Sequence, residues 1–431
     1  MFYHIHVTLQ YTANSGKADV VEIMTDIAAH YGSQPVNKVP PGTGSTSRWC
    51  RIGPHILSIP AIQAGLAGYS DMAMRVVARR RGCPYAVTEA LLDRVILTGG
   101  RGRENRSVLC PADHPVAGQL MGSRADEMAA AAKILLAAGF DVIDLNFACP
   151  VKKVMGRCRG GYLLGDPQQA IDIMRAVRAV VPGPLTLKLR RALDESAPAA
   201  ENFDRVCNEA VNLGFAALAV HGRTVEQKYT GSADWNFLRT IKSRYPTMTI
   251  FGSGDVFTAS DAWRLYTQSG VDGVWIARGA IGNPWIFKEF ADLMAGKPAP
   301  APQRIFAQRE ALLEHFALAV EIYGEAQAAR QMRKIGIKYA RLHPQGAEVW
   351  RAFIAVKSKA HWDAVLDRFY SSDGPGRKAE SVPDAQDLYH NEKPASAEEK
   401  GIPAQQDHSV SYPHEIEALD TSRCGWENSA C

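Results

Sequence analysis

The sequence predicts an α/β fold: a (β/α)₈ TIM barrel followed by a small C-terminal helical domain. Eight short apolar runs lie between positions 55 and 277, and helix-like segments separate them. Most of these runs do not alternate with polar residues, which is typical of strands buried on both faces of a parallel sheet. Eight such strands favour a closed barrel over an open, doubly wound sheet. No strand-like run occurs between residues 303 and 370, so we expect helices there.

Ordinary sequence signals bound the individual elements. The predicted strands cover residues 55–62, 84–89, 116–122, 141–146, 184–190, 216–221, 247–252 and 273–277. The clearest predicted helices cover residues 125–138, 167–181, 201–213 and 259–269. One of them begins with Asp166 at the cap position and Pro167 in the first turn, a combination typical of a helix start.

The apolar pattern and the composition divide the chain into four parts. Residues 1–52 form an N-terminal extension without clear periodicity, residues 53–298 form the barrel, and residues 299–370 form the helical domain. Residues 371–431 hold 12 acidic and 5 basic residues, a composition typical of a disordered acidic tail. We therefore expect both extensions to be poorly ordered.

Charge and cysteine usage restrict the class of protein. The net charge is +4 and the acidic tail contributes −7, so the first 370 residues hold about +11, which is compatible with a polyanionic partner such as RNA. The eight cysteines form no Cys-x-x-Cys pair, so we expect no metal site and a reducing, cytoplasmic setting. No apolar run reaches about 18 residues and no basic stretch precedes an apolar core at the start, so we expect neither a membrane span nor a secretory signal.

Cys149 follows the fourth predicted strand and is the candidate proton donor. Barrel enzymes place their reacting groups at the carboxyl ends of the strands, and a thiol with an ordinary pKa is mostly protonated at neutral pH. The alternative is a buried structural cysteine. Nearby cations would favour the thiolate instead, unless they face RNA phosphates or the substrate neutralises them. These cations are Lys152, Lys153, Arg157 and Arg159.

Other strand ends hold polar residues of suitable chemistry. Lys188 and Arg190 lie two apart on the fifth strand and so face the same side, where a cation needs an anionic partner such as a reduced flavin. His221 ends the sixth strand, and Gln119 in the third can donate and accept hydrogen bonds at a ring edge. A salt bridge, or a polar residue that closes a loop, remains the alternative for each of them.

Glycine clusters end the last two strands and predict a phosphate site. Exposed backbone N–H groups and an arginine bind phosphate, and the loops after strands seven and eight are the usual phosphate site of this fold. The candidate contacts are Gly252, Ser253, Gly254, Ala277 and Arg278.

The helical domain holds basic residues at steps of three and four. They would share one helix face, either as a solvated charged face or as a ridge that follows RNA phosphates. In the second case Arg333 and Lys334 are the candidate substrate contacts. The full set is Arg330, Arg333, Lys334, Lys338 and Arg341.

At this point the chain resembles the tRNA-dihydrouridine synthase family over residues 53 to 360. Single motifs occur in other flavin barrels, but the ordered set followed by a helical domain is specific. The motifs are AGLAGYSD at 64–71, QLMG at 119–122, DLNFACP at 144–150, KLR at 188–190, HGRT at 221–224, GSGD at 252–255 and ARGAIGNPW at 277–285.

The resemblance implies an FMN enzyme that uses NADPH to reduce the flavin. Hydride would pass from the flavin to C6 of a flipped-out uridine in tRNA, and Cys149 would protonate C5. Asn146 and Arg190 match positions near the flavin and the uracil. We expect a monomer. The resemblance also implies FMN contacts at Ala64, Leu66, Gln119, Lys188, His221, Gly252, Ser253, Gly254, Ala277 and Arg278.

The sequence departs from the family pattern at three places. Gly65-Leu66 replaces the usual Pro-Met, and Ala148 replaces the usual glycine before the cysteine. Residues 156–162 replace a smaller stretch and add Cys158, a second thiol that is either a bystander or a rival proton donor.

Two alternatives stay open. One is a flavin barrel that acts on a free small molecule, of the dihydropyrimidine or dihydroorotate type. In that case the helical domain and its basic residues would have no role. The other is a non-catalytic RNA-binding protein on the scaffold of a former enzyme.

Overall fold

The structure is a computed structural model, and it describes residues 50–100, 104 and 107–380. The predicted disorder of most of the N-terminal extension and of the acidic tail beyond residue 380 lies outside the described residues. No helix in the described ranges is both long and apolar enough to cross a membrane.

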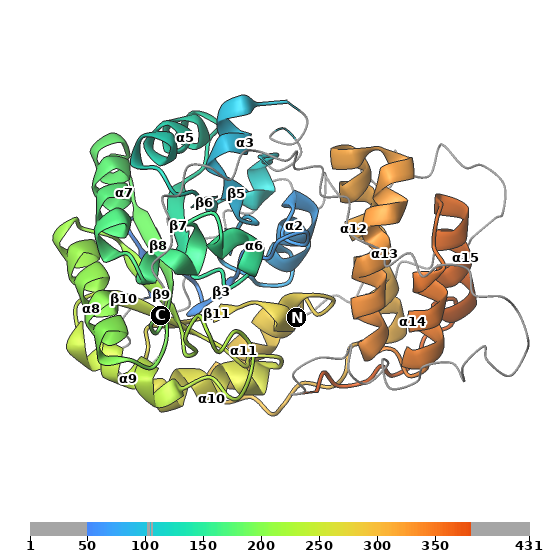
Figure 1. Cartoon of the computed structure of the whole chain (residues 1–431). Helices are drawn as coiled ribbons and strands as arrows, with labels where there is room; N and C mark the ends of the chain where they lie inside the picture. Colours follow the sequence, from blue (N-terminus) through green and yellow to red (C-terminus); the bar gives the residue numbers. More distant parts are fainter. Residues whose placement is uncertain (1–49, 101–103, 105–106, 381–431) are drawn as a thin grey trace, which may run out of the picture. The chain divides into compact units, whose positions relative to one another are not determined.

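A closed parallel barrel of eight strands forms the larger part of the structure (Figure 1), as the sequence predicts. The ring closes because β11 pairs with β3, β3 with β4, and β4 with β6. A further short strand, β5 (Leu91–Leu92), pairs with β6. The barrel strands are β3 (Ala61–Gln63), β4 (Ala86–Val87), β6 (Val116–Met121), β7 (Val142–Phe147), β8 (Leu185–Arg190), β9 (Ala217–His221), β10 (Thr249–Ser253) and β11 (Gly273–Ile276).

The first predicted strand, residues 55–62, is wrong in its first half. Residues 51–56 form an antiparallel hairpin, β1 (Arg51–Ile52) with β2 (His55–Ile56), because Gly53 adopts φ +56° in the turn between them. Ile52 and Leu57 are buried in one cluster with inward-facing barrel residues such as Ile62. The hairpin therefore adds apolar side chains to the core of the barrel.

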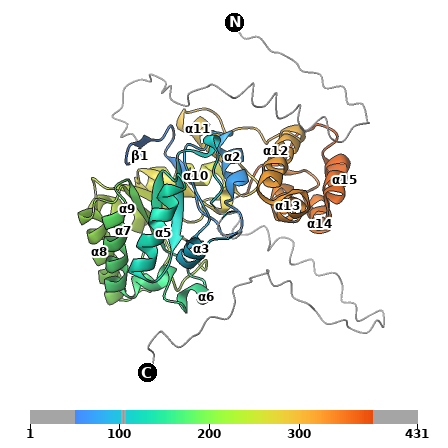
Figure 2. The ribbon, with the colours of Figure 1, turned by 90° about the horizontal axis from the view of Figure 1, so that it is seen from above.

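Helices surround the strands, and α5, α7 and α8 lie side by side in both views (Figures 1 and 2). The predicted cap is present, since the Asp166 carboxylate accepts a hydrogen bond of 3.1 Å from the Gln169 N–H. One helix begins four residues before its predicted start because Ser196 caps it. The helices of the barrel are α2 (Met72–Arg79), α3 (Asp93–Thr98), α5 (Ala125–Ala137), α6 (Lys152–Met155), α7 (Pro167–Val180), α8 (Ala197–Asn212), α9 (Trp235–Arg244), α10 (Ala259–Ser269) and α11 (Ile286–Met294). Short 3₁₀ turns occur at η1 (Pro111–Asp113), η2 (Gly160–Leu164) and η3 (Arg278–Ala280).

The predicted helical domain follows the barrel. Its helices are α12 (Ile305–Tyr323), α13 (Glu325–Tyr339), α14 (Gly346–Ile354) and α15 (Lys359–Phe369), with the turn η4 (Ala340–Leu342) after α13. Its core, which includes Phe316, Phe353 and Trp362, is continuous with Val76 of α2 and with Trp285 of the barrel. The described residues after α15 still contact this domain, since the Ile305 N–H donates to the Gly374 oxygen at 3.0 Å.

Candidate active site

The inward-facing side chains at the carboxyl ends of the strands define the region that we call the barrel mouth. Ala117, Ala219 and Phe251 belong to the inner cluster of the barrel, and alternation along a strand gives the residues two positions later the same direction. The register pairs Asn146 with Lys188 and Arg190 with His221. The inward-facing polar set is Gln119, Asp144, Asn146, Lys188, Arg190, His221 and Ser253.

Cys149 lies two residues beyond β7, half-buried at the barrel mouth. Its backbone N–H donates to the Asn146 Oδ1 at 3.1 Å, and its carbonyl oxygen accepts from the Gly161 N–H at 3.0 Å. Burial raises the pKa of the Cys149 thiol, while a backbone hydrogen bond from Val151 and the charge of Arg190 oppose this only in part. The thiol is therefore protonated at neutral pH, as a proton donor must be.

The cations that follow Cys149 in sequence do not act on it together. Lys152 and Lys153 are exposed on the short helix α6, whereas Arg159 is buried and forms an ion pair of 3.3 Å with Asp93. Cys158 has a left-handed backbone, φ +54°, in the turn after α6.

Lys188 extends into the barrel mouth from β8. Its Nζ donates to the Leu189 and Ala219 carbonyl oxygens at 3.2 and 3.4 Å and to the Ser253 Oγ at 3.3 Å. Burial, and then the neighbouring charge of Arg190, lower the pKa of Lys188 to about 7, against the opposing effect of Asp144. An anionic ligand beside this amine would restore its charge.

Arg190 is held by backbone oxygens on three sides. Its Nε donates to Ala148 at 3.0 Å, and its Nη1 donates to Thr224 at 2.8 Å and Lys228 at 2.6 Å. Its guanidinium carbon lies 5.4 Å from the ring centre of Tyr229. Arg190 thus links the backbone beside Cys149 to the loop after β9.

His221 ends β9, and its ring lies beside Ser253 at the end of β10. Its Nδ1 lies 3.3 Å from the Ser253 Oγ, and its Nε2 lies 3.4 Å from Arg223. Burial, with the charges of Lys188 and Arg190 among others, holds the pKa of His221 well below its usual range. The ring is therefore neutral at pH 7 and can donate one hydrogen bond and accept another.

The predicted phosphate residues lie on adjacent loops, but they do not all face the mouth. Gly254 has φ +118°, and a Cβ placed on it would lie 3.4 Å from the His221 ring. Arg278 starts η3, with its guanidinium 4.7 Å from the Phe257 ring centre. Gly252 faces the helix layer instead, because a Cβ there would meet Leu265 at 2.8 Å.

Asp255 is a charged residue of this region that the sequence reasoning did not select. Both of its carboxylate oxygens accept from Arg223 at 2.8 Å, and Arg278 lies 3.9 Å away. Its position directly after Gly252-Ser-Gly254 could have identified it from the sequence as a residue of this site. Asp255 orients these arginines at the edge of the glycine loops.

The loop after β3 runs close to the neighbouring strand end. A Cβ placed on Gly65 would lie 2.1 Å from the Thr88 oxygen and 3.3 Å from the Gln119 Oε1. Ala64 beside it is buried, and the Leu66 N–H donates to the Ser70 Oγ at 2.7 Å. At Gly65 the backbone thus lies closer to Thr88 than a residue with a Cβ could in this conformation.

The basic residues of α13 and η4 do not form one exposed ridge, and the prediction of a shared charged face is wrong for Arg341 in η4. Its Nη2 donates to the Gly279 and Ile281 oxygens at 3.1 and 2.7 Å, so this arginine joins the helical domain to η3. Lys334 is half-buried, with its Nζ 5.4 Å from the Tyr69 ring centre. Arg330 and Arg333 are exposed.

The donor set at the barrel mouth fits a planar ring with carbonyl groups and a phosphate. Gln119, Lys188 and His221 offer amide, ammonium and imidazole groups to ring edges. Glycines at positions 65 and 254 let the backbone pack closely against Thr88 and Ala233, where a Cβ would collide. A flavin mononucleotide has this combination of groups.

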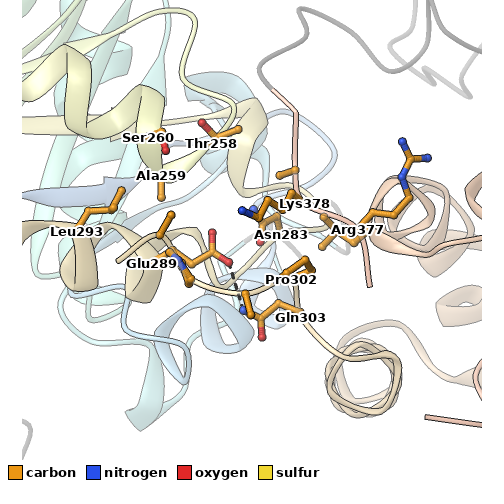
Figure 3. A pocket seen from close by; sticks show the side chains of 15 residues that line it. Thr258, Ala259, Ser260, Asn283, Glu289, Leu293, Pro302, Gln303, Arg377 and Lys378 are labelled. Atoms are coloured by element: carbon orange, nitrogen blue, oxygen red, sulfur yellow. Dashed lines mark hydrogen bonds between the residues drawn. The ribbon is translucent and has the colours of Figure 1, made fainter. Parts of the chain in front are cut away.

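A cavity of about 120 Å³ lies elsewhere, between the start of α10 and residues 299–303 (Figure 3). There Gln303 donates to the Glu289 carboxylate at 3.2 Å, and the buried Asn283 Oδ1 has no hydrogen-bond partner among the described residues. None of the residues expected from the sequence to bind cofactor or substrate lines this cavity.

Comparison with known proteins matches residues 62–372 to the family model described as dihydrouridine synthase (Dus). The tRNA-dihydrouridine synthase B of Pseudomonas putida is 34% identical over 322 residues, which cover 74% of this chain and 94% of that protein. The protein of the same name from Pseudomonas syringae pv. tomato is 36% identical, over 70% of this chain and 88% of that protein. A probable tRNA-dihydrouridine synthase of Mycobacterium tuberculosis is 31% identical, over 74% and 84% respectively.

Proposed function

The chain belongs to the dihydrouridine synthase family and is therefore an oxidoreductase, and on this premise we propose that it reduces the C5–C6 double bond of specific uridines in tRNA, with FMN as its cofactor and NADPH as the reductant. The observation that supports this best is the convergence of the protonated Cys149 thiol, Lys188 and His221 on one barrel mouth. A monomeric enzyme in the cytoplasm completes the proposal.

The residues of the mouth would hold FMN at two ends. Gln119 and Lys188 would bind the ring, with Ala64 and Leu66 beside it. His221, Ser253, Gly254, Ala277 and Arg278 would bind the phosphate side, and Gly252 would contribute through its backbone alone. Reduced FMN, when bound, would supply the hydride for C6.

Cys149 would supply the proton. Hydride at C6 and a proton at C5 saturate the bond, and the thiolate that remains regains its proton from solvent. Arg190, fixed by three carbonyl oxygens, would orient the uracil beside this thiol together with Asn146. Proton transfer from a group with a raised pKa fits a step in which the substrate carbon becomes basic.

The RNA would reach the mouth with its target base flipped out of the stack. Exposed Lys152 and Lys153 on α6, and exposed Arg333 on α13, would contact phosphates. Lys334 lies nearer the loop after β3, so we assign it to the edge of the mouth.

The direct experiment incubates the purified full chain with FMN, NADPH and an unmodified tRNA transcript, followed by mass spectrometry of the nucleosides. We expect dihydrouridine from the wild type and from Cys158→Ala, and its loss in Cys149→Ala. No dihydrouridine from any tRNA would refute the function, and retained activity in Cys149→Ala would refute the assignment of the proton donor.

A further inference from the structure

A chain of hydrogen bonds runs beneath the barrel mouth, and we call it the amide relay: Asp144, Gln119, Asn146 and the backbone N–H of Cys149. The Gln119 Nε2 donates to the Asp144 Oδ2 at 2.7 Å, and the Asn146 Nδ2 donates to the Gln119 Oε1 at 2.8 Å. The Asn146 Oδ1 then accepts from the backbone N–H groups of Ala148 and Cys149, both at 3.1 Å.

The chemistry of the groups allows one direction for this relay. An ionised carboxylate only accepts hydrogen bonds, and a backbone N–H only donates. Gln119 must therefore turn its nitrogen to Asp144 and its oxygen to Asn146, and Asn146 must turn its oxygen to Cys149. The carboxylate of Asp144 and the N–H of Cys149 therefore require the same orientation of the Gln119 and Asn146 amides. Each amide nitrogen keeps a second N–H for a ligand.

The side chain of Asp144 contacts the relay through Gln119 alone. It is fully buried, and its second oxygen accepts from the Thr186 Oγ1 at 2.5 Å. Gln119 is also buried, so without Asp144 its nitrogen would lose a partner that water cannot readily replace. The resulting movement of Gln119 would pass to Asn146, which is the acceptor for the N–H of Cys149.

We propose that Asp144 is a positioning residue: it orients the Gln119 amide and, through Asn146, holds the backbone of Cys149 at the barrel mouth. This role rests on the proposed function, because Asp144 would position both the proton donor Cys149 and the amides of Gln119 and Asn146 that face the flavin. Asp144 itself touches neither, because Gln119 and Asn146 lie between it and Cys149.

Alkylation of Cys149 in the purified full chain tests this role without flavin turnover or RNA. The rate with iodoacetamide would be measured by mass spectrometry of the Cys149 peptide across a range of pH. In Asp144→Ala we expect a rate roughly tenfold higher, the scale set by one lost hydrogen bond, because the backbone of Cys149 is released. Asp144→Asn retains an acceptor for Gln119, and its amide can donate to Thr186, so its rate stays close to that of the wild type.

Two further variants keep the test decisive if Asp144→Ala folds poorly. Thr186→Val is the matched control, since it removes the other hydrogen bond of Asp144 and leaves the relay intact; its rate should equal that of the wild type. Gln119→Met cuts the relay at its centre and should reproduce the roughly tenfold increase, and Asp144→Ala added to it should give no further increase.

Several outcomes would overturn the proposal: a wild-type rate in Gln119→Met, multiplied effects in the double variant, or a rate in Asp144→Asn equal to that in Asp144→Ala. The last would assign the effect to the charge of Asp144. Dihydrouridine formation, measured in parallel, separates the two proposals. If the wild type makes no dihydrouridine while the relay variants alter alkylation, the function fails and the positioning role stands.

Discussion

Replacement of Lys188 by methionine should change how the stability of the protein depends on pH. The pKa of Lys188 is about 7 in the folded chain, mainly through burial and then the charge of Arg190, against 10.5 for a free lysine. Between these two values the unfolded chain binds more protons than the native one, so the contribution of Lys188 to the free energy of unfolding rises with pH. Below pH 7 both states are protonated and the full cost of the buried charge applies.

The size of the effect follows from that shift. One pKa unit corresponds to about 1.4 kcal/mol, and from pH 7 to pH 9 the relief amounts to about 2 kcal/mol. For a domain of this size that is a rise in Tm of roughly 4–8 °C in the wild type relative to Lys188→Met.

Thermal unfolding of the flavin-free full chain at pH 7, 8 and 9, at constant ionic strength, measures this difference. Lys153→Met is the matched control, because Lys153 is exposed and its removal should leave the pH dependence of the wild type unchanged. Parallel curves for wild type and Lys188→Met would refute the inference that a buried amine loses its proton near neutrality. Under the proposed function, FMN affinity should also fall from pH 7 to pH 9 in the wild type and not in Lys188→Met.

Three other changes give distinct outcomes. Gly65→Ala should destabilise the fold by about 1–3 kcal/mol in urea unfolding, because its Cβ would lie 2.1 Å from the Thr88 oxygen; Gly183→Ala, with nothing within 4 Å, should not. Arg159→Met should lower the free energy of unfolding by about 3–5 kcal/mol at pH 8, because the buried Asp93 loses its ion-pair partner. Adding Asp93→Leu should recover much of this loss, and additive losses in the double variant would contradict the inference. Arg330→Gln with Arg333→Gln should weaken tRNA binding and make its salt dependence shallower, whereas Arg341→Gln should lower stability; an unchanged salt slope in the first variant would remove α13 from the RNA surface.

The sequence predicted the eight barrel strands and most of the polar residues at their carboxyl ends, because both depend on local signals. Strand alternation placed Lys188 and Arg190 on one side, and strand ends located Cys149 and His221. Asp144 gave no such signal: a carboxylate within an apolar strand acquires its role only from Gln119 and Thr186, which lie 25 and 42 positions away in the chain.

Tertiary contacts also determine which basic residues of the helical domain are exposed, and helical spacing alone does not. Arg333 and Arg341 have similar positions in the basic stripe, yet Arg341 is turned to the carbonyl oxygens of η3 while Arg333 is exposed. The hairpin β1–β2 was missed because residues 55–62 are mainly apolar, and apolar residues continue from the hairpin into the strand that follows it without a clear break. Periodicity identifies a buried segment, and it does not identify the partner that buries it.

Reduction of uridine in tRNA is the central claim, and a map of dihydrouridine in the tRNA of the source organism tests it most directly. In a strain that lacks this chain, we expect dihydrouridine to disappear from one or more tRNA positions, to return with the wild-type gene, and to stay absent with Cys149→Ala. Dihydrouridine at every position in the strain that lacks the chain would contradict the claim.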